Sequence, residues 1–311
     1  MMGKLLEVRR IGSDEIAYNP CVIVQKNAKK IVNGKNIIAV RVENLESYWF
    51  DRKRYDPHIM FFERVGDSLE PIPDAPVFHQ YEDPWSTWIT GPDGQPQLLF
   101  GGVKIDYGGP KLVITTQIHM AGSVQELDPH HPVAVVRGMK DVRLAETSTG
   151  KLAVFTRPTR GKGFPGRIGF TMIDRIQDLE KSVKGAHLLK FDLDKKTRIG
   201  ANEVFAVKNS LHVFCHLATA DPIKRQGKEI INFEQSTIHY AGYEFNLDPN
   251  PPFAAVIPLR KIADRSDFPA NDKFGKGERF KDVIFPGGTG GPDLTEFYTG
   301  VEDARVGVMN L

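Results

Sequence analysis

The chain has 311 residues, of which 41% are hydrophobic and 26% are charged. This composition is typical of a globular protein and excludes disordered and collagen-like classes. The 41 Lys and Arg residues against 39 Asp and Glu leave a net charge of +2. No overall field therefore draws the protein to nucleic acid or to a membrane surface, and any anion site must be local.

The two cysteines, Cys21 and Cys215, lie far apart, each within an apolar run. This pattern favours buried free thiols over a disulfide, which suits a reducing compartment. The sequence contains neither a CxxC nor an HExxH motif that would predict a metal site. The N-terminus lacks the apolar core of a signal peptide, and no segment approaches the length of a membrane span. We therefore expect a cytoplasmic protein that binds neither membrane nor nucleic acid and has no metal or cofactor.

Five short apolar runs recur along the chain at intervals of 54 to 83 residues. They are IIAVRVE from Ile37, LLFGGV from Leu98, LAVFTRP from Leu152, LHVFCHLA from Leu211 and LTEFYTG from Leu294. Turn-forming residues precede them, such as the Asn33-Gly34 pair before the first run, and these residues tolerate the positive φ angles of hairpins. Each run therefore predicts the second strand of a β-hairpin.

The strands that would feed these hairpins also share a pattern. Each opens with a polar pair, followed by Pro or Val and a mostly apolar strand. The second members of the pairs are Asn19, Asp83, Asp141, Glu203 and Asp282. Helical periodicity is nearly absent; the segment 171–189 is the one candidate for a short helix or helical turn.

A β-rich unit that occurs five times predicts an all-β fold, a five-bladed β-propeller that spans residues 1–311 as one domain. The alternative is a seven-strand sandwich whose acids merely lie in turns. A sandwich explains the strands but not their regular spacing.

In a propeller the first strand of each blade lines the central channel, so the five polar positions are expected to meet at one mouth. Carboxylates held so close need cations or ligand hydroxyls as partners. Basic residues lie near these polar positions within the repeated unit. They are Arg41, Lys140, Arg143, Arg157 and Arg160. The planar fork of Arg suits phosphate oxygens. Two alternatives are open, because Arg143 could instead pair with Asp141 between blades, and His216 could be either a ligand-facing or a core histidine.

At this point the motifs resemble a known family. The order YNP, RVE, EDP, KDVRL, FTRP, NEV, HYAGYEFNLDP, KDVIFPGG and YTGVEDARVG, from Tyr18 to Gly307, is similar to that of inverting mannoside phosphorylases built on a five-bladed propeller. It is closer still to their relatives, the β-1,2-mannan mannosyltransferase/phosphorylases of mannogen metabolism. The shared order and spacing carry the resemblance, because a single motif such as EDP is weak.

The resemblance implies roles for individual residues. Asp83, in the Asp-Pro motif, would be the proton donor, and Lys140, Arg157 and Tyr240 would bind phosphate. The family carries a histidine shortly after its Arg-Pro motif where this chain has TRGKG, so Arg160 or Lys162 would have to substitute. Positions where the family contacts sugar are Asn19, Arg41, Glu43, Asp141, Asp282 and Asp303, and the polar pattern adds Glu203 and, for phosphate, Arg143.

The residue inventory agrees with this chemistry. An inverting hydrolase needs a second carboxylate to activate water, whereas phosphate is already a nucleophile and needs only one acid and a cationic cradle. We therefore expect conversion of β-1,2-mannan oligosaccharides plus phosphate to α-mannose 1-phosphate, and the reverse synthesis, with GDP-mannose as a further donor. The alternatives are an inverting glycoside hydrolase, with Glu203 or Asp282 as base, and a non-catalytic carbohydrate-binding propeller.

Overall fold

The computed structural model describes residues 2–27, 30–51, 54–106, 113–158, 166–194, 196–225, 228–233, 235–251, 253, 256–270, 276–290 and 294–311. Strands dominate, as predicted, and the helices are short. They are α1 (Leu45–Phe50), α2 (Leu179–Ser182) and the 3-10 turns η1 (Ile176–Asp178), η2 (Val183–Gly185), η3 (Arg265–Asp267) and η4 (Glu278–Phe280). Within 171–189 the predicted helical turn is found as η1, α2 and η2, whereas α1 was not predicted.

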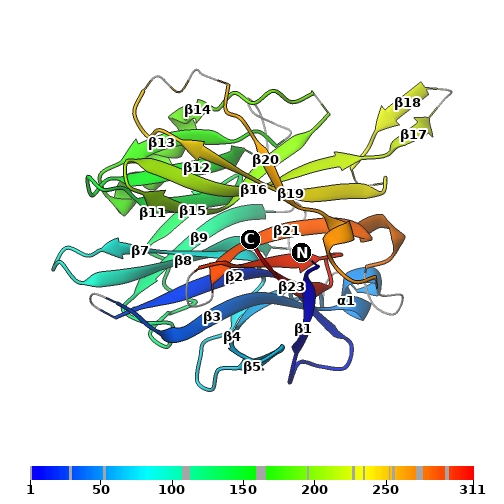
Figure 1. The fold of residues 1–311 in the computed structure, drawn as a ribbon, viewed down its shortest axis with the longest axis horizontal. Helices are drawn as coiled ribbons and strands as arrows, with labels where there is room; N and C mark the ends of the chain where they lie inside the picture. The colour runs from blue at the N-terminus through cyan, green and yellow to red at the C-terminus, as the bar shows by residue number, and fades with distance from the viewer. Residues whose placement is uncertain are drawn as a thin grey trace.

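The strands form antiparallel sets that follow one another along the chain (Figure 1). The first set is β2 (Glu15–Asn27), β3 (Lys30–Asn44), β4 (His58–Val65) and β5 (Ser68–Pro71), with β6 (Phe78–His79) beside β4. The second is β7 (Tyr81–Thr90), β8 (Pro96–Asp106), β9 (Val113–Ala121) and β10 (Ala134–Arg137). The third is β11 (Met139–Glu146), β12 (Leu152–Pro158), β13 (Gly169–Ile173) and β14 (His187–Leu188).

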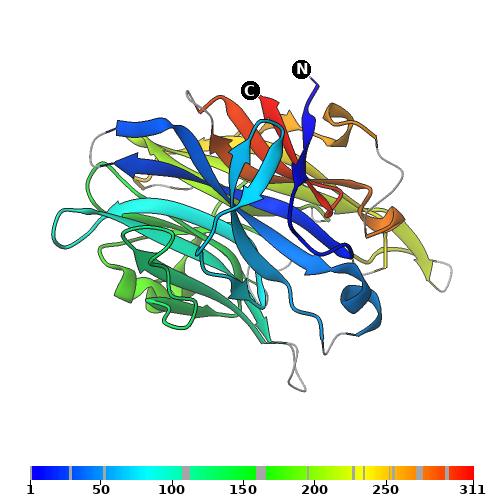
Figure 2. The same cartoon turned by 90° about the horizontal axis from the view of Figure 1, so that it is seen from below.

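The remaining strands complete the sheets. The fourth set is β15 (Arg198–Val207), β16 (Ser210–Ala220), β19 (Ile238–Leu247) and β20 (Arg260–Ala263). The hairpin β17 (Pro222–Arg225) and β18 (Lys228–Ile231) projects from it (Figure 1). The fifth is β21 (Asp282–Gly290), β22 (Glu296–Val301) and β23 (Arg305–Asn310), closed by β1 (Lys4–Val8) from the other end of the chain. The two termini therefore lie side by side (Figures 1 and 2).

The first strands of these sets touch one another in a closed circuit. β2 lies against β7, β7 against β11, β11 against β15, β15 against β21, and β21 against β2. The apolar core is divided accordingly, because each large cluster joins two consecutive sets. Phe61 and Phe100, for example, pack between the first and second sets with their ring centroids 5.1 Å apart. This arrangement holds the beginnings of five strands around one axis.

Each of these first strands has a β-bulge. The pairing shifts at Asn19 in β2, Asp83 in β7 and Asp141 in β11, and all three residues have positive φ, at 48°, 51° and 49°. In β15 the extra residue is Asn202, and in β21 it is Gly287. A bulge bends its strand and redirects the side chain at that position.

The bulges correct two of the predicted positions. Glu203 follows the bulge residue Asn202 by one place and is paired with Phe214, and Asp282 precedes Gly287 by five. A shift of one residue turns a side chain to the other face of a strand, which separates Glu203 from the bulge position, whereas Asp282 is separated from its bulge by five residues of β21. The predicted turn at Asn33-Gly34 is also wrong, since β2 and β3 stay paired out to Asn27 and Lys30.

The contact between β2 and β21 yields a stability prediction. A Cβ atom at Gly287 would lie 2.2 Å from the backbone oxygen of Pro20, which cannot swing away. We expect Gly287→Ala to lower the free energy of unfolding by about 1–3 kcal/mol, measured as a shift of the urea midpoint. Gly185→Ala is the matched control, because nothing lies within 4 Å of its Cβ position. Equal midpoints for both variants would contradict the close approach of these strands.

Candidate functional site

The carboxylate of Asp83 lies at the start of β7 between two side chains from the first sheet. Asn19 Nδ2 donates to Asp83 Oδ1 at 2.8 Å, and Arg41 Nη1 contacts the same oxygen at 3.4 Å. The positive φ of Asn19 and Asp83 turns both side chains toward each other across the bulges. Among the described residues the contacts of Asp83 fall on Oδ1, which leaves Oδ2 for a ligand.

Arg41 is surrounded by acids. Its guanidinium lies 2.7 Å from Glu82 and 3.0 Å from Glu43, and it also donates to Tyr55 at 3.1 Å. Burial by itself raises the pKa of Glu43, but Arg41 and Lys276 outweigh it and hold the pKa at about 2. Glu43 is thus a buried anion with two cationic partners, and its position beside Arg41 fixes the guanidinium that contacts Asp83.

Lys276 is a cation of this site that sequence reasoning missed. Its ammonium group is buried, lies 2.5 Å from Glu43 and 3.7 Å from Asp303, and donates to the hydroxyl of Tyr18. It also lies 4.5 Å from the ring centre of Tyr48. Lys276 belongs to none of the sequence motifs described above, so the sequence did not predict its role. Asp303, with a φ of 51°, is brought to the same cluster from the turn after β22, and burial raises its pKa.

A second group of charges is centred on Asp141. Arg157 Nη1 donates to Asp141 Oδ2 at 2.6 Å, and Arg143 Nη2 lies 3.7 Å from Oδ1. Burial raises the pKa of Asp141, yet the two arginines dominate and lower it to about 2. Arg143 also donates to the backbone oxygens of Asn202 and Val142, so it ties β11 to β15 as the bridging alternative predicted.

His216 is the second residue whose place was left open by the sequence. It is fully buried, its ring is stacked between Tyr240 and Phe285, and its Nδ1 lies 2.8 Å from Asn202 Oδ1. Burial, and then Arg157, lower its pKa to about 3, so the ring is neutral at physiological pH. Because Nδ1 donates to Asn202, Nε2 carries the lone pair. Within the described part of the chain Nε2 has no hydrogen-bond partner, so it can accept from a ligand.

The two groups lie close enough for their charges to act on each other. Burial lowers the pKa of Arg157, but Asp141 and, more weakly, Tyr240 and Asp83 raise it above the ordinary value. The pKa of His216 is lowered mainly by burial, and the negative charge of Asp83 opposes this lowering in part. Arg198 stands at the edge of this region, since Gly166 lies against both its side chain and that of Arg157. An acid and a group of cations therefore border one polar centre.

Three predicted residues contact partners other than the groups described above. Lys140 turns toward Glu82, 3.7 Å away, and is partly exposed. Glu203 is partly buried beside Gly288; burial raises the pKa of Glu203 to about 8, against a hydrogen bond from the backbone N–H of Thr289. Asp282 binds His239 at 2.5 Å at the exposed start of β21. The prediction for Arg160 falls outside the described residues.

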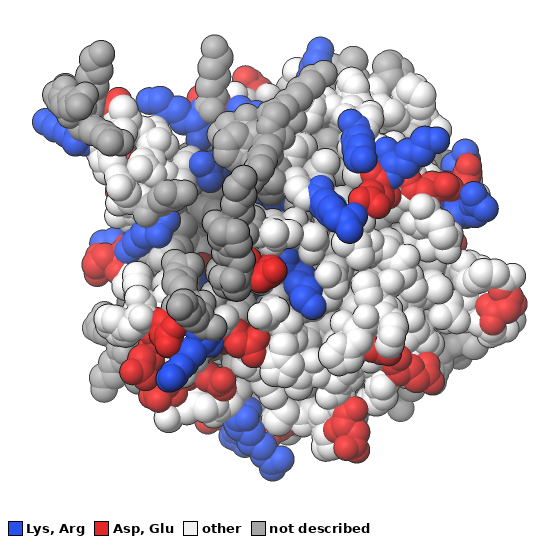
Figure 3. Space-filling view, turned by 180° about the vertical axis from the view of Figure 1, so that it is seen from behind, with Lys and Arg blue, Asp and Glu red and all other residues white. Residues whose placement is uncertain are grey.

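The described residues contain no group of three or more His, Cys, Asp or Glu side chains placed to hold a metal ion. Both cysteines are buried and free. No helix in the described part of the chain has the length and apolar character to span a membrane. On the face shown in Figure 3, Lys and Arg lie interspersed with Asp and Glu, as the small net charge leads one to expect.

Comparison with solved structures places this geometry among known folds. The chain is similar to a mannose phosphorylase from Leishmania mexicana solved with phosphate, at 24% identity and a TM-score of 0.79 over 100% of this chain and 88% of that one. It is similar to a GDP-Man-dependent mannosyltransferase from the same organism, at 22% identity and a TM-score of 0.76 over 100% and 89%. A β-1,2-mannobiose phosphorylase from Listeria innocua has 14% identity and a TM-score of 0.62 over 97% and 92%.

The resemblance to mannoside phosphorylases that the motifs indicated is confirmed by these structures, which at such identities share the fold. No curated protein sequence matches the chain. A family model described as "Protein of unknown function (DUF1861)" matches residues 5–311. The chain therefore belongs to the DUF1861 family.

Proposed function

We propose that this protein is an inverting β-mannoside phosphorylase and mannosyltransferase on a single five-bladed propeller domain. The observation that carries the proposal is the carboxylate of Asp83, whose described contacts fall on Oδ1 and whose charge acts on the buried Arg157 and His216. The closed circuit of first strands supports the five blades. The structures similar to this chain include a mannose phosphorylase solved with phosphate. A cytoplasmic location stays a prediction from the sequence.

The proposed reaction uses Asp83 as the proton donor. Asp83 gives its proton to the departing sugar oxygen, directly or through a substrate hydroxyl, while phosphate attacks the anomeric carbon from the opposite face. The C–O bond of the β-mannoside breaks and a C–O bond to phosphate forms, which gives α-mannose 1-phosphate. In reverse, Asp83 accepts the proton from the attacking sugar hydroxyl.

The phosphate would be held by groups of different character. Arg157 offers a planar guanidinium, already oriented by Asp141. The neutral His216 offers a lone pair at Nε2, which would accept a hydrogen bond from the P–OH group of a monoprotonated phosphate. Asn19, Arg41 and Asp303 lie on the Asp83 side of the centre, where we assign the mannose ring.

The state of Glu203 disfavours the hydrolase alternative. A hydrolytic base must be ionised at working pH, and a carboxyl group with a pKa of about 8 is mostly protonated at pH 7. Asp282, the other proposed base, is engaged with His239. Asp141 is engaged with two arginines. None of these three described carboxyl groups is therefore suited to activate water.

The linkage and the nucleotide-sugar donor are finer parts of the proposal. A relative of similar fold is a GDP-Man-dependent mannosyltransferase, and another is a β-1,2-mannobiose phosphorylase. We propose β-1,2-mannan oligosaccharides as the substrate, with phosphate or mannose 1-phosphate as the partner. GDP-mannose is proposed as a second donor, whose diphosphate would use the same cations.

Product analysis tests the reaction and the role of Asp83. The purified protein, given β-1,2-mannobiose with and without inorganic phosphate, is expected to form α-mannose 1-phosphate only when phosphate is present. We expect Asp83→Asn to lower the rate by about 10²–10⁴-fold, because the amide has no proton to donate. Free mannose formed at the same rate without phosphate would establish the hydrolase instead. Sugar binding by the wild type without any turnover would support the non-catalytic alternative, and unchanged turnover in Asp83→Asn would contradict the role of Asp83.

Substitution of Arg157 tests the phosphate site. We expect Arg157→Ala to lower kcat/KM for phosphate by about 10²–10³-fold, since it removes an oriented positive charge from the transition state. Arg157→Lys keeps a cation beside the buried Asp141 but loses the fork, so it separates phosphate binding from folding. The control is Arg137→Ala, an exposed arginine paired with Glu180. A loss below about tenfold in a folded Arg157→Ala variant would contradict the assignment.

The raised pKa of Glu203 predicts a pH dependence of stability. Its folded pKa of about 8 lies above the model-peptide value of 4.5. The folded state therefore holds the proton of Glu203 more tightly than the unfolded state. The resulting contribution to the free energy of unfolding is fully present below pH 4.5 and is lost as the pH rises to 8. We expect Glu203→Gln to remove this fall, so that the stability difference between variant and wild type changes across that window. Urea unfolding at pH 5, 6.5 and 8 measures it, with exposed Glu229→Gln as the control. Parallel curves for Glu203→Gln and wild type would refute the raised pKa.

A further inference from the structure

A groove of about 510 Å³ lies beside the central cluster. Tyr240 belongs to both, because it lines the groove and stacks on His216 at 5.1 Å. The volume falls within the range of roughly 300–1,000 Å³ found for ligand pockets. The groove therefore has the size of a binding site and opens next to the proposed reaction centre.

The floor of the groove comes from one face of two paired strands. Leu217 and Thr219 in β16 lie opposite Ala241 and His239 in β19, and Tyr243 continues the same face. Side chains two residues apart share a face of a strand, so these five form a continuous strip. The strip combines aliphatic carbon, a phenol ring and a hydroxyl group. This mixture suits a ligand that has apolar C–H surfaces as well as hydroxyl groups.

The charges of the groove indicate what kind of ligand it takes. Lys261 lies 2.5 Å from Asp264. His239 lies between two acids, 2.5 Å from Asp282 and 2.9 Å from Asp221. Both basic side chains of the described lining are thus already paired with carboxylates. A diphosphate or another anion would therefore meet net negative charge in the groove. Carboxylate oxygens readily accept hydrogen bonds from sugar hydroxyls, and they favour a neutral, polyhydroxylated ligand.

We propose that this groove binds the distal sugars of a β-mannan oligosaccharide whose first units occupy the centre near Asp83. The proposal rests on the proposed function and adds a preference for chains longer than the disaccharide. It also gives a place to Asp282, which the sequence predicted to contact sugar and which lies at this groove rather than at the centre. Tyr240 lines the groove and contacts His216, so the chain would pass around this residue from the centre to the groove.

The test fills the groove and compares substrates of two lengths. Thr219 is exposed, so Thr219→Trp is expected to leave the fold intact while it blocks the strip. We expect kcat/KM for β-1,2-mannotetraose to fall by about tenfold or more, as for a lost binding contact, while that for β-1,2-mannobiose changes less than about threefold. Ala241→Trp fills the same strip from β19 and should give the same pattern.

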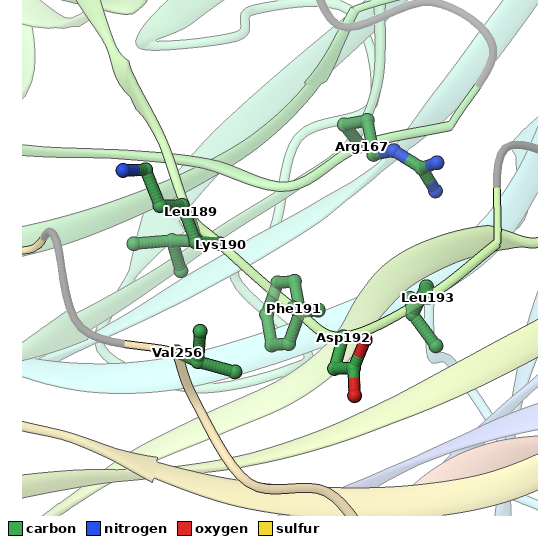
Figure 4. A pocket seen from close by; sticks show the side chains of 7 residues that line it. All are labelled: Arg167, Leu189, Lys190, Phe191, Asp192, Leu193 and Val256. Carbon is green, nitrogen blue, oxygen red and sulfur yellow. The ribbon is translucent and has the colours of Figure 1, made fainter.

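The control lies at a second groove of about 370 Å³, shown in Figure 4, which meets the first at Leu193 and in which the exposed Val256 faces Phe191. Val256→Trp adds the same side chain there and is expected to change neither substrate. Equal losses for both oligosaccharides, or no loss for either, in the two groove variants would overturn the proposal.

Direct binding separates a failure of this inference from a failure of the proposed function. If the wild type forms no sugar phosphate from either oligosaccharide, the proposed reaction is wrong, and titration calorimetry then decides on the groove. Tighter binding of mannotetraose than of mannobiose to the wild type, lost in Thr219→Trp, supports the groove. Equal affinities for both sugars in wild type and variant would refute it.

Discussion

The site depends on one backbone constraint, the left-handed conformation of the bulge residues Asn19, Asp83 and Asp141. A residue with a Cβ atom adopts this conformation at a cost of about 1–2 kcal/mol, so surrounding contacts must hold it in place. Asn19 and Asp83 hold each other by a hydrogen bond, and Asp141 is held by Arg157. Gly300 adds a further fit, because a Cβ atom there would lie 2.3 Å from Asn19 Oδ1. The strain is thus maintained by the same polar contacts that define the site.

These bulges explain why a ring of β-strands, whose core is apolar, can present buried charges. Regular alternation would send successive side chains to the two faces of a sheet, where they pack between neighbouring sheets. One extra residue interrupts this alternation, and at Asn19, Asp83 and Asp141 the polar side chain meets its partners in the site instead. Beyond each bulge the strand returns to packing, as Trp85 and Leu144 show. The fold and the site therefore use different parts of the same strand.

The sequence predicted the strands well because their signals are local. Alternating apolar residues and turn residues located the first two strands of every set, and the Asp-Pro and Asn-Pro pairs marked two of the bulges. The predicted polar positions coincide with the bulge residue in three strands but not in β15 and β21, because Asn202 and Gly287 carry no acid, while the neighbouring Glu203 and the distant Asp282 do. Lys276 and His216 depend on contacts between residues more than ten places apart. Only the folded arrangement shows that one meets Glu43 and the other Asn202.

The balance of buried charge is the strongest argument for the kind of chemistry at this centre. A buried carboxylate without a cation is costly, and here Glu43 and Asp141 each have two cationic neighbours. Glu203 avoids the cost by holding its proton. Asp83 differs from them, since its described contacts fall on one oxygen and the other can face a substrate. In the proposed reaction Asp83 supplies the acid and Arg157 an oriented guanidinium, and phosphate needs no base because it is already a nucleophile. For this reason the charge pattern favours phosphorolysis over hydrolysis independently of the resemblance in fold.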